Sequence, residues 1–187
     1  SVKWASCNVG ASSPEEQGNY YAWGEVEPKD NYTWETYKWC DGTEDSMLKY
    51  CTNGEYSYNV IDNKTVLDLE DDAAHVNMGG NWRMPTYDEF YELKTKCNFI
   101  YTTYKGVKGH KVVGPNGNSI FLPLGFFVDG TKVHEIVYSI YLTASLNDNV
   151  SNEAYEFFPF VTASTSKHYW LASNARYYGR VVRAVCE

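Results

Sequence analysis

The chain has 187 residues, of which 43% are hydrophobic and 21% are charged, a composition typical of one globular domain. Its net charge of −8 argues against nucleic acid as a partner, because proteins bind phosphate groups with clustered Lys and Arg. The same charge argues against binding to an anionic membrane surface. No apolar run of about 18 residues is present, so we expect no direct membrane insertion.

Tyrosine is unusually abundant in this chain. It contains 17 Tyr beside 8 Phe and 6 Trp. A core by itself does not favour the tyrosine hydroxyl, whereas a binding surface does, because the ring is large, rigid and amphipathic. Tyrosine is also common in strands, so the excess fits a β-rich fold equally well.

The first part of the chain is predicted to be extended and irregular. Residues 2–9 and 19–26 have the composition of strands. The long polar stretch that follows, 27–66, has no helical period, and we interpret it as an irregular insertion. Loops of this length inside compact domains are usually functional or are held by other contacts. Residues 69–78 predict a short helix.

The clearest helix signal lies at residues 87–97. Thr86 suits the N-cap position, and Glu89, three residues later, completes a capping box. The apolar residues at i, i+3 and i+7 that share one helix face are Phe90, Leu93 and Cys97. This spacing predicts an amphipathic helix.

Strands dominate the rest of the chain. The strand-like segments are 98–104, 106–113, 118–123, 154–161, 168–173 and 179–186. Residues 114–117, Gly-Pro-Asn-Gly, predict a hairpin turn between two of them. Residues 126–142 are apolar and mixed, 143–153 are polar, and 162–167 form a polar loop. The order of elements predicts an α+β fold with two helices and mostly antiparallel strands.

The cysteine pattern leaves the redox state open. Cys40 and Cys51 enclose a short polar loop, and Cys97 and Cys186 connect the predicted helix with the last strand, so each pair is a candidate disulfide. The fifth cysteine, Cys7, would then be a free thiol. The alternative is five reduced, mostly buried thiols. No CxxC motif is present, so we expect no structural zinc site.

Four parts of the sequence resemble a domain that is common in gut Bacteroidetes. They are residues 2–11 (VKWASCNVGA) with 20–25 (YYAWGE), residues 72–74 with 80–86 (GNWRMPT) and Glu89, residues 114–123 (GPNGNSIFLP), and residues 176–185 (RYYGRVVRAV). Each motif is weak alone, but the set is specific and covers nearly the whole chain. The domain belongs to the formylglycine-generating-enzyme-like branch of the C-type lectin fold.

This resemblance implies one C-type-lectin-like domain over residues 1–187, with two helices, twisted antiparallel sheets and long irregular loops. Some members of the family are variable proteins of diversity-generating retroelements, in which mutagenesis at adenines rewrites codons near the C-terminus. Residues 141–178 resemble such a variable region because they are rich in residues that adenine-rich codons become. A plain surface loop rich in Asn and Ser is the alternative.

The chain departs from the family pattern at two places. A Trp usually follows the tyrosine at the position where this chain has Tyr141 and Leu142, which suggests a changed binding position. The last motif usually reads Arg-Pro-Val, whereas this chain has Arg-Ala-Val at residues 183–185.

We predict that the chain is not an enzyme. Formylglycine-generating enzymes use a pair of cysteines in the C-terminal part, where this chain has only Cys186. None of the histidines lies in a motif with a nucleophilic Ser or Cys; they are His75, His110, His134 and His168. Asp148, Glu153 and Glu156 resemble glycosidase carboxylates in type, but we interpret them as solvated acidic residues.

We expect no metal and no cofactor. The densest acidic run, residues 70–72, is explained by its position at a helix N-terminus. Residues 27–29, Glu-Pro-Lys, depart from the calcium-binding motif of sugar-binding lectins because lysine has the wrong charge. Arg83 and Arg183 are predicted to belong to the framework, where they hold ion pairs or backbone carbonyls.

The C-terminal third combines rigid aromatic residues with adaptable polar groups, as binding faces do. The expected ligand-binding residues are Tyr141, Leu142, Asn147, Asn149, Asn152, Tyr155, Phe158, His168, Trp170, Asn174 and Tyr177. We therefore predict a non-catalytic domain, secreted, on a cell surface or on a phage particle, that recognises a protein or glycan ligand on a cell surface. A lectin of fixed sugar specificity and a surface-appendage adhesin domain are the alternatives.

Overall fold

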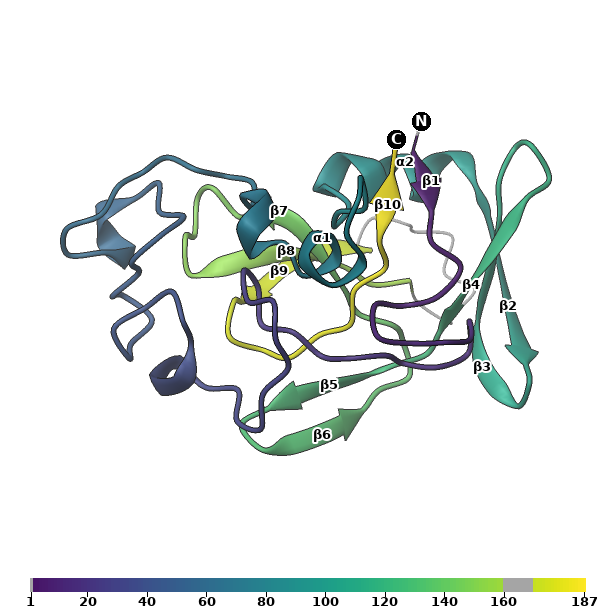
Figure 1. The fold of residues 1–187 in the computed structure, drawn as a ribbon, viewed down its shortest axis with the longest axis horizontal. Coiled ribbons are helices and arrows are strands. Elements are labelled where there is room, and N and C mark those ends of the chain that lie inside the picture. The colour runs from purple at the N-terminus through teal and green to yellow at the C-terminus, as the bar shows by residue number, and fades with distance from the viewer. Residues whose placement is uncertain (1, 160–169) are drawn as a thin grey trace.

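The structure, a computed structural model, describes residues 2–159 and 170–187. Within these residues it is a mixed α+β arrangement of two α-helices, four small antiparallel sheets and much irregular backbone (Figure 1). The predicted class, helices combined with small antiparallel sheets, is thereby confirmed. No helix in the described part is long and apolar enough to cross a membrane.

The two ends of the chain pair with each other. Strand β1 (Lys3–Trp4) runs antiparallel to β10 (Val185–Cys186), with Lys3 opposite Cys186. Figure 1 shows the N- and C-termini side by side at one edge of the molecule. This pairing joins the beginning and the end of the chain in one sheet.

The longer strands predicted at 2–9, 19–26 and 179–186 are wrong. The backbone there is interrupted by bends and turns and changes partner every few residues, so no continuous ladder forms. For example, the Val9 N–H donates to the Val182 carbonyl at 2.9 Å, well outside the β1–β10 pair. The alternating side chains indicated extended backbone, whereas the ladder depends on a partner that stays alongside.

Helix α2 (Tyr87–Lys96) confirms the clearest sequence prediction. The Thr86 hydroxyl accepts from the Glu89 N–H at 3.3 Å, and the Glu89 carboxylate accepts from the Thr86 N–H at 2.8 Å. These two bonds form the predicted capping box. Phe90 and Leu93 are buried on the inner side of the helix, and Cys97 is its C-cap residue.

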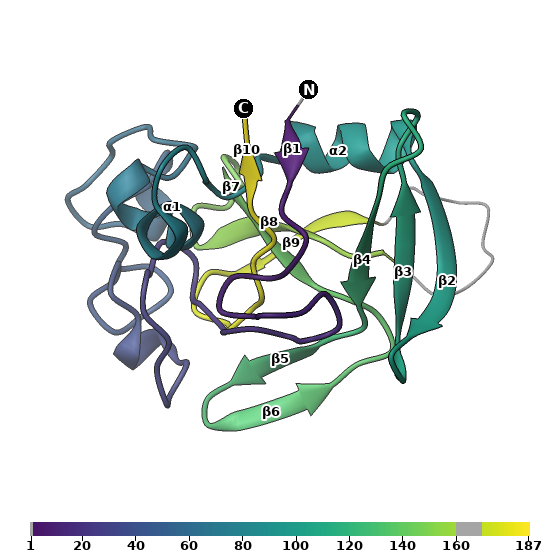
Figure 2. The same cartoon turned by 45° about the vertical axis from the view of Figure 1, so that its right-hand side comes forward.

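A meander follows the helix. Strands β2 (Asn98–Tyr104), β3 (Val107–Val113) and β4 (Ser119–Pro123) form an antiparallel sheet in the order β2-β3-β4. The Gly117 N–H donates to the Gly114 carbonyl at 3.0 Å, which closes the predicted turn. These three strands are confirmed to within one residue, and Figure 2 shows their sheet standing at one side of the molecule.

A second hairpin lies below the core in Figure 2. It consists of β5 (Phe126–Asp129) and β6 (Lys132–Glu135), in a region whose sequence was only apolar and mixed. Two bridges attach it to the rest of the molecule: Val128 pairs with Gly179, and Gly130 pairs with Tyr32.

The C-terminal third forms a three-stranded sheet. Its strands are β7 (Tyr141–Leu146), β8 (Glu153–Phe157) and β9 (Leu171–Ala175), with β8 in the centre. The segment 143–146, polar or mixed in sequence, is mostly buried strand, because the Thr143 hydroxyl finds an internal acceptor in the Tyr155 carbonyl at 2.8 Å. The predicted loop 162–167, the end of the strand predicted at 154–161 and the start of that predicted at 168–173 lie outside the described residues.

The predicted helix at 69–78 is divided in two. A 3₁₀ turn, η3 (Leu69–Asp71), precedes helix α1 (Ala73–Met78). Asp72 stands between them as the N-cap, and its carboxylate accepts from the backbone N–H groups of His75 at 2.9 Å and Met84 at 2.8 Å. These bonds give Asp72 an extended backbone and end the 3₁₀ turn.

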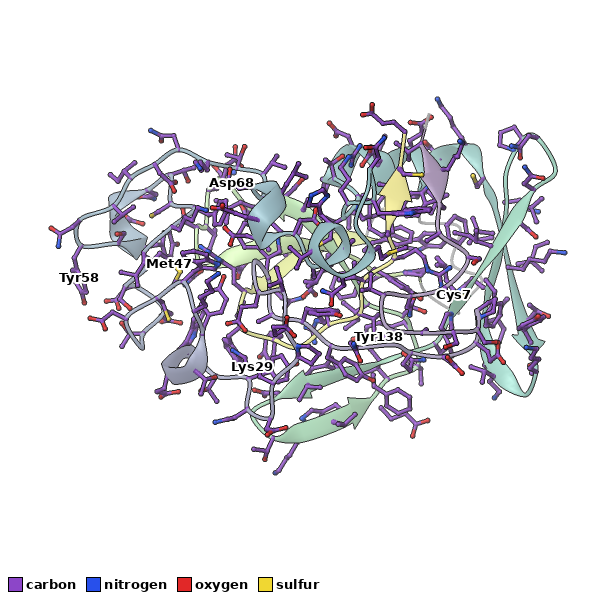
Figure 3. The ribbon with its side chains drawn as sticks, in the orientation of Figure 1. Cys7, Lys29, Met47, Tyr58, Asp68 and Tyr138 are labelled. Atoms are coloured by element: carbon purple, nitrogen blue, oxygen red, sulfur yellow. The ribbon has the colours of Figure 1, made fainter. Side chains whose placement is uncertain are left out.

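The insertion 27–66 forms a lobe at one end of the molecule (Figure 1). It is irregular, as predicted, apart from the short 3₁₀ helices η1 (Trp34–Thr36) and η2 (Gly54–Tyr56). Figure 3 shows Met47 inside this lobe and Tyr58 projecting from its far end, and Tyr58 is 75% exposed. The buried side chains of the lobe pack in one cluster with Ala22 and with Val128 of β5, which joins the lobe to the rest of the molecule.

Arg176, which follows β9, holds the insertion in place. Its guanidinium, 1% exposed, donates to the Tyr37 hydroxyl at 2.9 Å. It also donates to the backbone carbonyls of Lys49 at 3.0 Å, Tyr50 at 3.1 Å and Ser151 at 2.9 Å. One side chain from the C-terminal third thus joins three points of the insertion to the β7–β8 loop.

All five cysteines lie in the described part, and all are free thiols. Neither candidate disulfide is formed. The Cys40 thiol lies 3.1 Å from the Trp34 carbonyl, and the Cys51 thiol lies 3.1 Å from the Asn53 carbonyl, so each has a backbone acceptor of its own. Both side chains are buried, as the alternative of reduced thiols anticipated.

Candidate functional site

Four of the predicted binding residues belong to the core. Tyr141 is 0% exposed and Leu142 is 2% exposed, while Phe158 and Trp170 are each 7% exposed. Tyr141 and Trp170 pack in the same cluster as Phe90 of α2, and Leu142 packs in a second cluster. Because these side chains face the interior of the molecule, their assignment as ligand contacts is corrected to a packing role.

The remaining predicted residues reach the surface, with one outside the described part. Asn149 is exposed, and five others are partly exposed: Asn147, Asn152, Tyr155, Asn174 and Tyr177. His168 lies outside the described residues. The partly exposed residues do not form one patch, because the sheet separates them onto different surfaces.

One face of the β7–β8–β9 sheet carries a chain of hydrogen bonds. The Asn147 amide donates to the Ser173 hydroxyl at 2.9 Å, and that hydroxyl donates to the Glu153 carboxylate. Ser173 of β9 is directly opposite Tyr155 of β8, so Tyr155, Glu153 and Ser173 point to the same side. Sequence reasoning treated Glu153 as a solvated acid and missed Ser173, although the two-residue alternation from Tyr155 was a usable signal for Glu153.

Tyr155 is paired with a tyrosine from the first turn of α2. The rings of Tyr87 and Tyr155 are 4.7 Å apart and tilted by 60°. The Tyr87 N–H also donates to the Ser145 hydroxyl at 3.1 Å, which ties the helix start to β7. We call the set Tyr87, Asn147, Glu153, Tyr155 and Ser173 the polar face.

The loop between β7 and β8 borders the polar face. Within it the Asn149 N–H donates to the Asn147 side-chain carbonyl at 3.1 Å. Thr52 of the insertion holds the loop from outside, because its hydroxyl donates to the Asp148 carbonyl at 2.6 Å and its N–H donates to the Ser151 hydroxyl at 3.0 Å. The loop is therefore braced against the insertion.

Asn174 lies on the opposite side of the same sheet. Its amide donates to the Glu156 carboxylate at 2.9 Å, and Glu156 accepts from the Arg180 guanidinium at 2.8 Å. Burial raises the pKa of Glu156, and the nearby Arg180 charge and the hydrogen bonds partly offset this rise. The buried Glu156–Arg180 pair argues for a structural role of Glu156, not the solvated role that the sequence suggested.

Tyr177 belongs to a third location. Its ring lies 4.9 Å from Trp34 of the insertion and 4.4 Å from Tyr178, and its hydroxyl donates to the Asp129 carboxylate at 3.4 Å. It therefore lies among residues of η1 and β5, apart from the polar face. No pattern in the sequence indicated that the insertion reaches this residue.

The carboxylates near α1 form ion pairs with a lysine. Carboxylate oxygens of Asp68, Glu70 and Asp71 lie within 4.8 Å of one another, as metal ligands would. The Lys49 ammonium lies 2.8 Å from Asp68, 3.5 Å from Glu70 and 2.7 Å from Asp71. Hydrogen bonds from Lys49 and Lys64 lower the pKa of Asp68 to about 2. The acidic cluster is thus balanced by side-chain cations; Figure 3 labels Asp68.

The framework residues are placed as predicted. Arg83 donates to both Glu89 carboxylate oxygens, at 2.8 and 2.7 Å. Arg183 is buried and donates mainly to backbone carbonyls. His75 packs beside the Trp82 carbonyl, with its Nδ1 3.1 Å from that oxygen, in line with the packing role of a helical histidine.

These contacts leave the polar face as the candidate site in the C-terminal third. It offers hydroxyl, amide and carboxylate groups beside two tyrosine rings, on two strands, a helix start and the first residue of the β7–β8 loop. Comparison of the chain with protein-family models, with curated proteins and with solved structures returned no match.

Proposed function

We propose that the chain is a non-catalytic ligand-binding domain of the C-type-lectin-like kind. Its binding surface is the polar face with the neighbouring β7–β8 loop, and its ligand is a protein or another molecule exposed on a cell surface. The observation that carries the proposal is the hydrogen-bonded chain Asn147–Ser173–Glu153 beside the Tyr87–Tyr155 pair, all partly exposed, with every member except Asn147 on a strand or helix.

Such a surface is suited to recognition. Tyrosine rings provide a large contact area while losing little conformational entropy, and the neighbouring amide, hydroxyl and carboxylate groups adapt to different partners. Strands position these groups more firmly than a loop does. The contacts that the polar face makes within the chain still leave donor and acceptor capacity on Asn147, Glu153 and Ser173.

In the described parts of 141–178, the distribution of burial supports the idea of a variable surface on a constant scaffold. Buried residues such as Tyr141, Phe157 and Arg176 alternate with partly exposed ones such as Tyr155 and Ser173. Substitution of the exposed side chains leaves the core intact, whereas substitution of the buried ones does not. A secreted, cell-surface or phage-particle location follows from such a function.

The diversification part of the proposal is tested by sequencing this gene in many sister isolates. We expect substitutions at residues 147, 149, 155 and 173, and constancy at the buried positions between them. Substitutions spread evenly along the chain, or an invariant 141–178 segment, would contradict a diversified face.

The binding part is tested with fluorescently labelled protein on a panel of intact bacterial cells. We expect the wild-type chain to label some cells and the Tyr155→Ala/Ser173→Ala variant to label them at least tenfold more weakly. The matched control is Tyr101→Ala, because Tyr101 is exposed at 43% on β2, outside the polar face. Equal labelling by both variants, or none by the wild type, argues against the proposal.

A further inference from the structure

Five partly exposed rings form a continuous row outside the polar face. Trp34 contacts Tyr177 at 4.9 Å, Tyr177 contacts Tyr178 at 4.4 Å, Tyr178 contacts Phe127 at 5.8 Å, and Phe127 stacks on His134 at 4.7 Å. All five side chains are partly exposed. We call this set the aromatic row.

The row is assembled from three distant parts of the chain. Trp34 comes from η1 of the insertion, Phe127 and His134 come from β5 and β6, and the two tyrosines follow β9. In Figure 1 these three parts come together at the lower left of the molecule. A row that depends on three segments is not a by-product of one local motif.

Close backbone packing fixes the row. Gly179, directly after the two tyrosines, pairs with Val128 of β5. A Cβ atom at Gly179 would lie 2.9 Å from the Tyr32 ring and 3.0 Å from Val128, so only glycine allows this approach. The segment carrying Tyr177 and Tyr178 is therefore held against both the hairpin and the insertion.

A buried donor without a partner lies against the same rings. The Arg180 guanidinium carbon is 4.5 Å from the Phe127 ring centre and 4.7 Å from that of Tyr178. Arg180 is 3% exposed, and its Nε donates to Glu156, but its Nη1 has no hydrogen-bond partner among the described residues. A buried N–H without an acceptor is costly, so this position beside the two rings favours a small oxygen-bearing group such as a bridging water.

The charges near the row favour a neutral ligand. Arg180 is paired with Glu156, and Lys29 of the insertion is paired with Glu25 at 2.9 Å. Asp129, which accepts from Tyr177, adds a negative charge. An anionic phosphate or sulfate would meet no unpaired cation among these residues.

We propose that the aromatic row is a second binding site, which takes a neutral carbohydrate chain without calcium. The faces of the rings carry partial negative charge and attract the C–H groups of a sugar ring. The tyrosine hydroxyls, Asp129 and His134 provide donors and acceptors for sugar hydroxyls, and a hydroxyl or a bridging water supplies the acceptor that Arg180 lacks. The site is independent of the polar face.

The test is affinity electrophoresis of the folded chain in native gels that contain a neutral polysaccharide: xylan, mannan, starch or a β-glucan. Polygalacturonate serves as the anionic comparison. We expect at least one neutral polymer to retard the wild type, and Trp34→Ala and Tyr178→Ala each to weaken that retardation about tenfold, as the loss of one ring contact would. Circular dichroism checks that the variants are folded.

The polar-face variant Tyr155→Ala/Ser173→Ala is the matched control and should be retarded like the wild type. If a polymer retards the row variants but no longer retards this variant, the sugar binds at the polar face. That result overturns the second-site inference and leaves the proposed function standing. Retardation by polygalacturonate alone, or by no polymer, also overturns it.

A second measurement needs no variant. In proton NMR of the wild type, a short oligosaccharide of the retarding polymer should shift the ring signals of His134 and leave those of His75 unchanged, because His75 lies beside the Trp82 carbonyl, outside the row. Unchanged His134 signals at a saturating concentration contradict the proposal even if the row variants misfold.

Discussion

At the scale of single residues, Arg176 shows how an irregular insertion of about forty residues is given one position. Its four donor contacts end on a tyrosine hydroxyl and three backbone carbonyls, and its charge also lies 4.7 Å from the Trp23 ring centre. The carbonyls of Tyr50 and Ser151 are buried at these contacts, so without the guanidinium they would lose their hydrogen bonds. A cation in contact with aromatic rings and carbonyls is stabilised without a carboxylate partner.

We predict that Arg176→Met destabilises the protein by about 3 kcal/mol or more, because each buried carbonyl left without a donor costs about 1–3 kcal/mol. Urea denaturation measures the loss, and limited proteolysis should show new cleavage within 27–66. Lys108→Met, an exposed lysine on β3, is the control and should change stability by less than about 0.5 kcal/mol. Unaltered proteolysis in Arg176→Met would contradict the anchoring role.

Glu89 is a second residue whose environment matters, because it shifts the pKa of the carboxyl group and so makes stability depend on pH. Burial alone would raise the pKa of its carboxyl group, but the hydrogen bonds from Arg83 and from the Thr86 N–H more than offset burial and lower it below 4.5. A carboxyl group whose pKa is lower in the folded state stabilises that state above the unfolded pKa. The stabilisation is lost as the pH falls through the folded pKa.

The free energy of unfolding of the wild type should therefore fall as the pH drops below about 4.5. Glu89→Gln keeps the shape of the side chain but cannot ionise, so its stability should fall less steeply over that range. Urea titrations at a series of pH values between about 3 and 7 measure both slopes. Equal slopes for the two proteins would show that Glu89 does not contribute to the acid sensitivity.

At the scale of elements, α2 and the β7–β8–β9 sheet differ in how much of their structure the local sequence predicts. Helix α2 begins at a capping box encoded within four residues, and its inner side is covered by Trp4 and Phe157, which lie 4.9 and 4.5 Å from Phe90. In the sheet, successive side chains point to opposite sides, and other parts of the chain partly cover each side. Alternation in β8 thus assigned residues to a side without telling which side faces a ligand.

Removing the cap of α2 should have a defined cost. Thr86→Ala is expected to destabilise the protein by about 1 kcal/mol, because the Glu89 N–H loses its acceptor. Thr95→Ala is the matched control: Thr95 is exposed in the last turns of the helix, where its hydroxyl donates only to the helix's own carbonyls, and alanine favours the helix. Thermal unfolding should show a lower midpoint for the first variant only.

At the scale of the whole molecule, Arg183 joins the two ends of the chain. Its guanidinium, 0% exposed, donates to the Asn8 side chain at 2.8 Å and to the carbonyls of Ala5 at 3.1 Å, Ser6 at 3.0 Å and Phe121 at 2.9 Å. Burial lowers the pKa of this guanidinium. The residue joins the N-terminal segment, β4 and the C-terminal segment, next to the β1–β10 pair.

We predict that Arg183→Lys destabilises the protein by about 2 kcal/mol or more, although it keeps the charge. A lysine ammonium is a compact group that does not reproduce the planar fork, so at least one buried carbonyl loses its donor. The reverse exchange at an exposed site, Lys111→Arg on β3, is the control. Chemical denaturation of both variants measures the two changes in stability. Equal stability of Arg183→Lys and wild type would contradict the role of Arg183 in joining the two ends of the chain.

Local sequence signals were sufficient to predict those features that depend on a few neighbouring residues. The capping box of α2, the strands and turn of β2–β4 and the roles of Arg83 and Arg183 were read from local spacing or from motifs, and the structure has them. The irregular course of 27–66 also followed from composition. These features can be predicted without knowing which other segments pack against the element.

Which side chains are buried was not predictable from local patterns and became clear from the fold. Tyr141 and Trp170 were expected at the surface but are packed against α2, which precedes them by many residues in the chain. The polar face needs Tyr87 from α2, and the aromatic row needs Trp34 from the insertion. Burial depends on contacts between distant segments, and the periodicity of one segment carries no record of its partners.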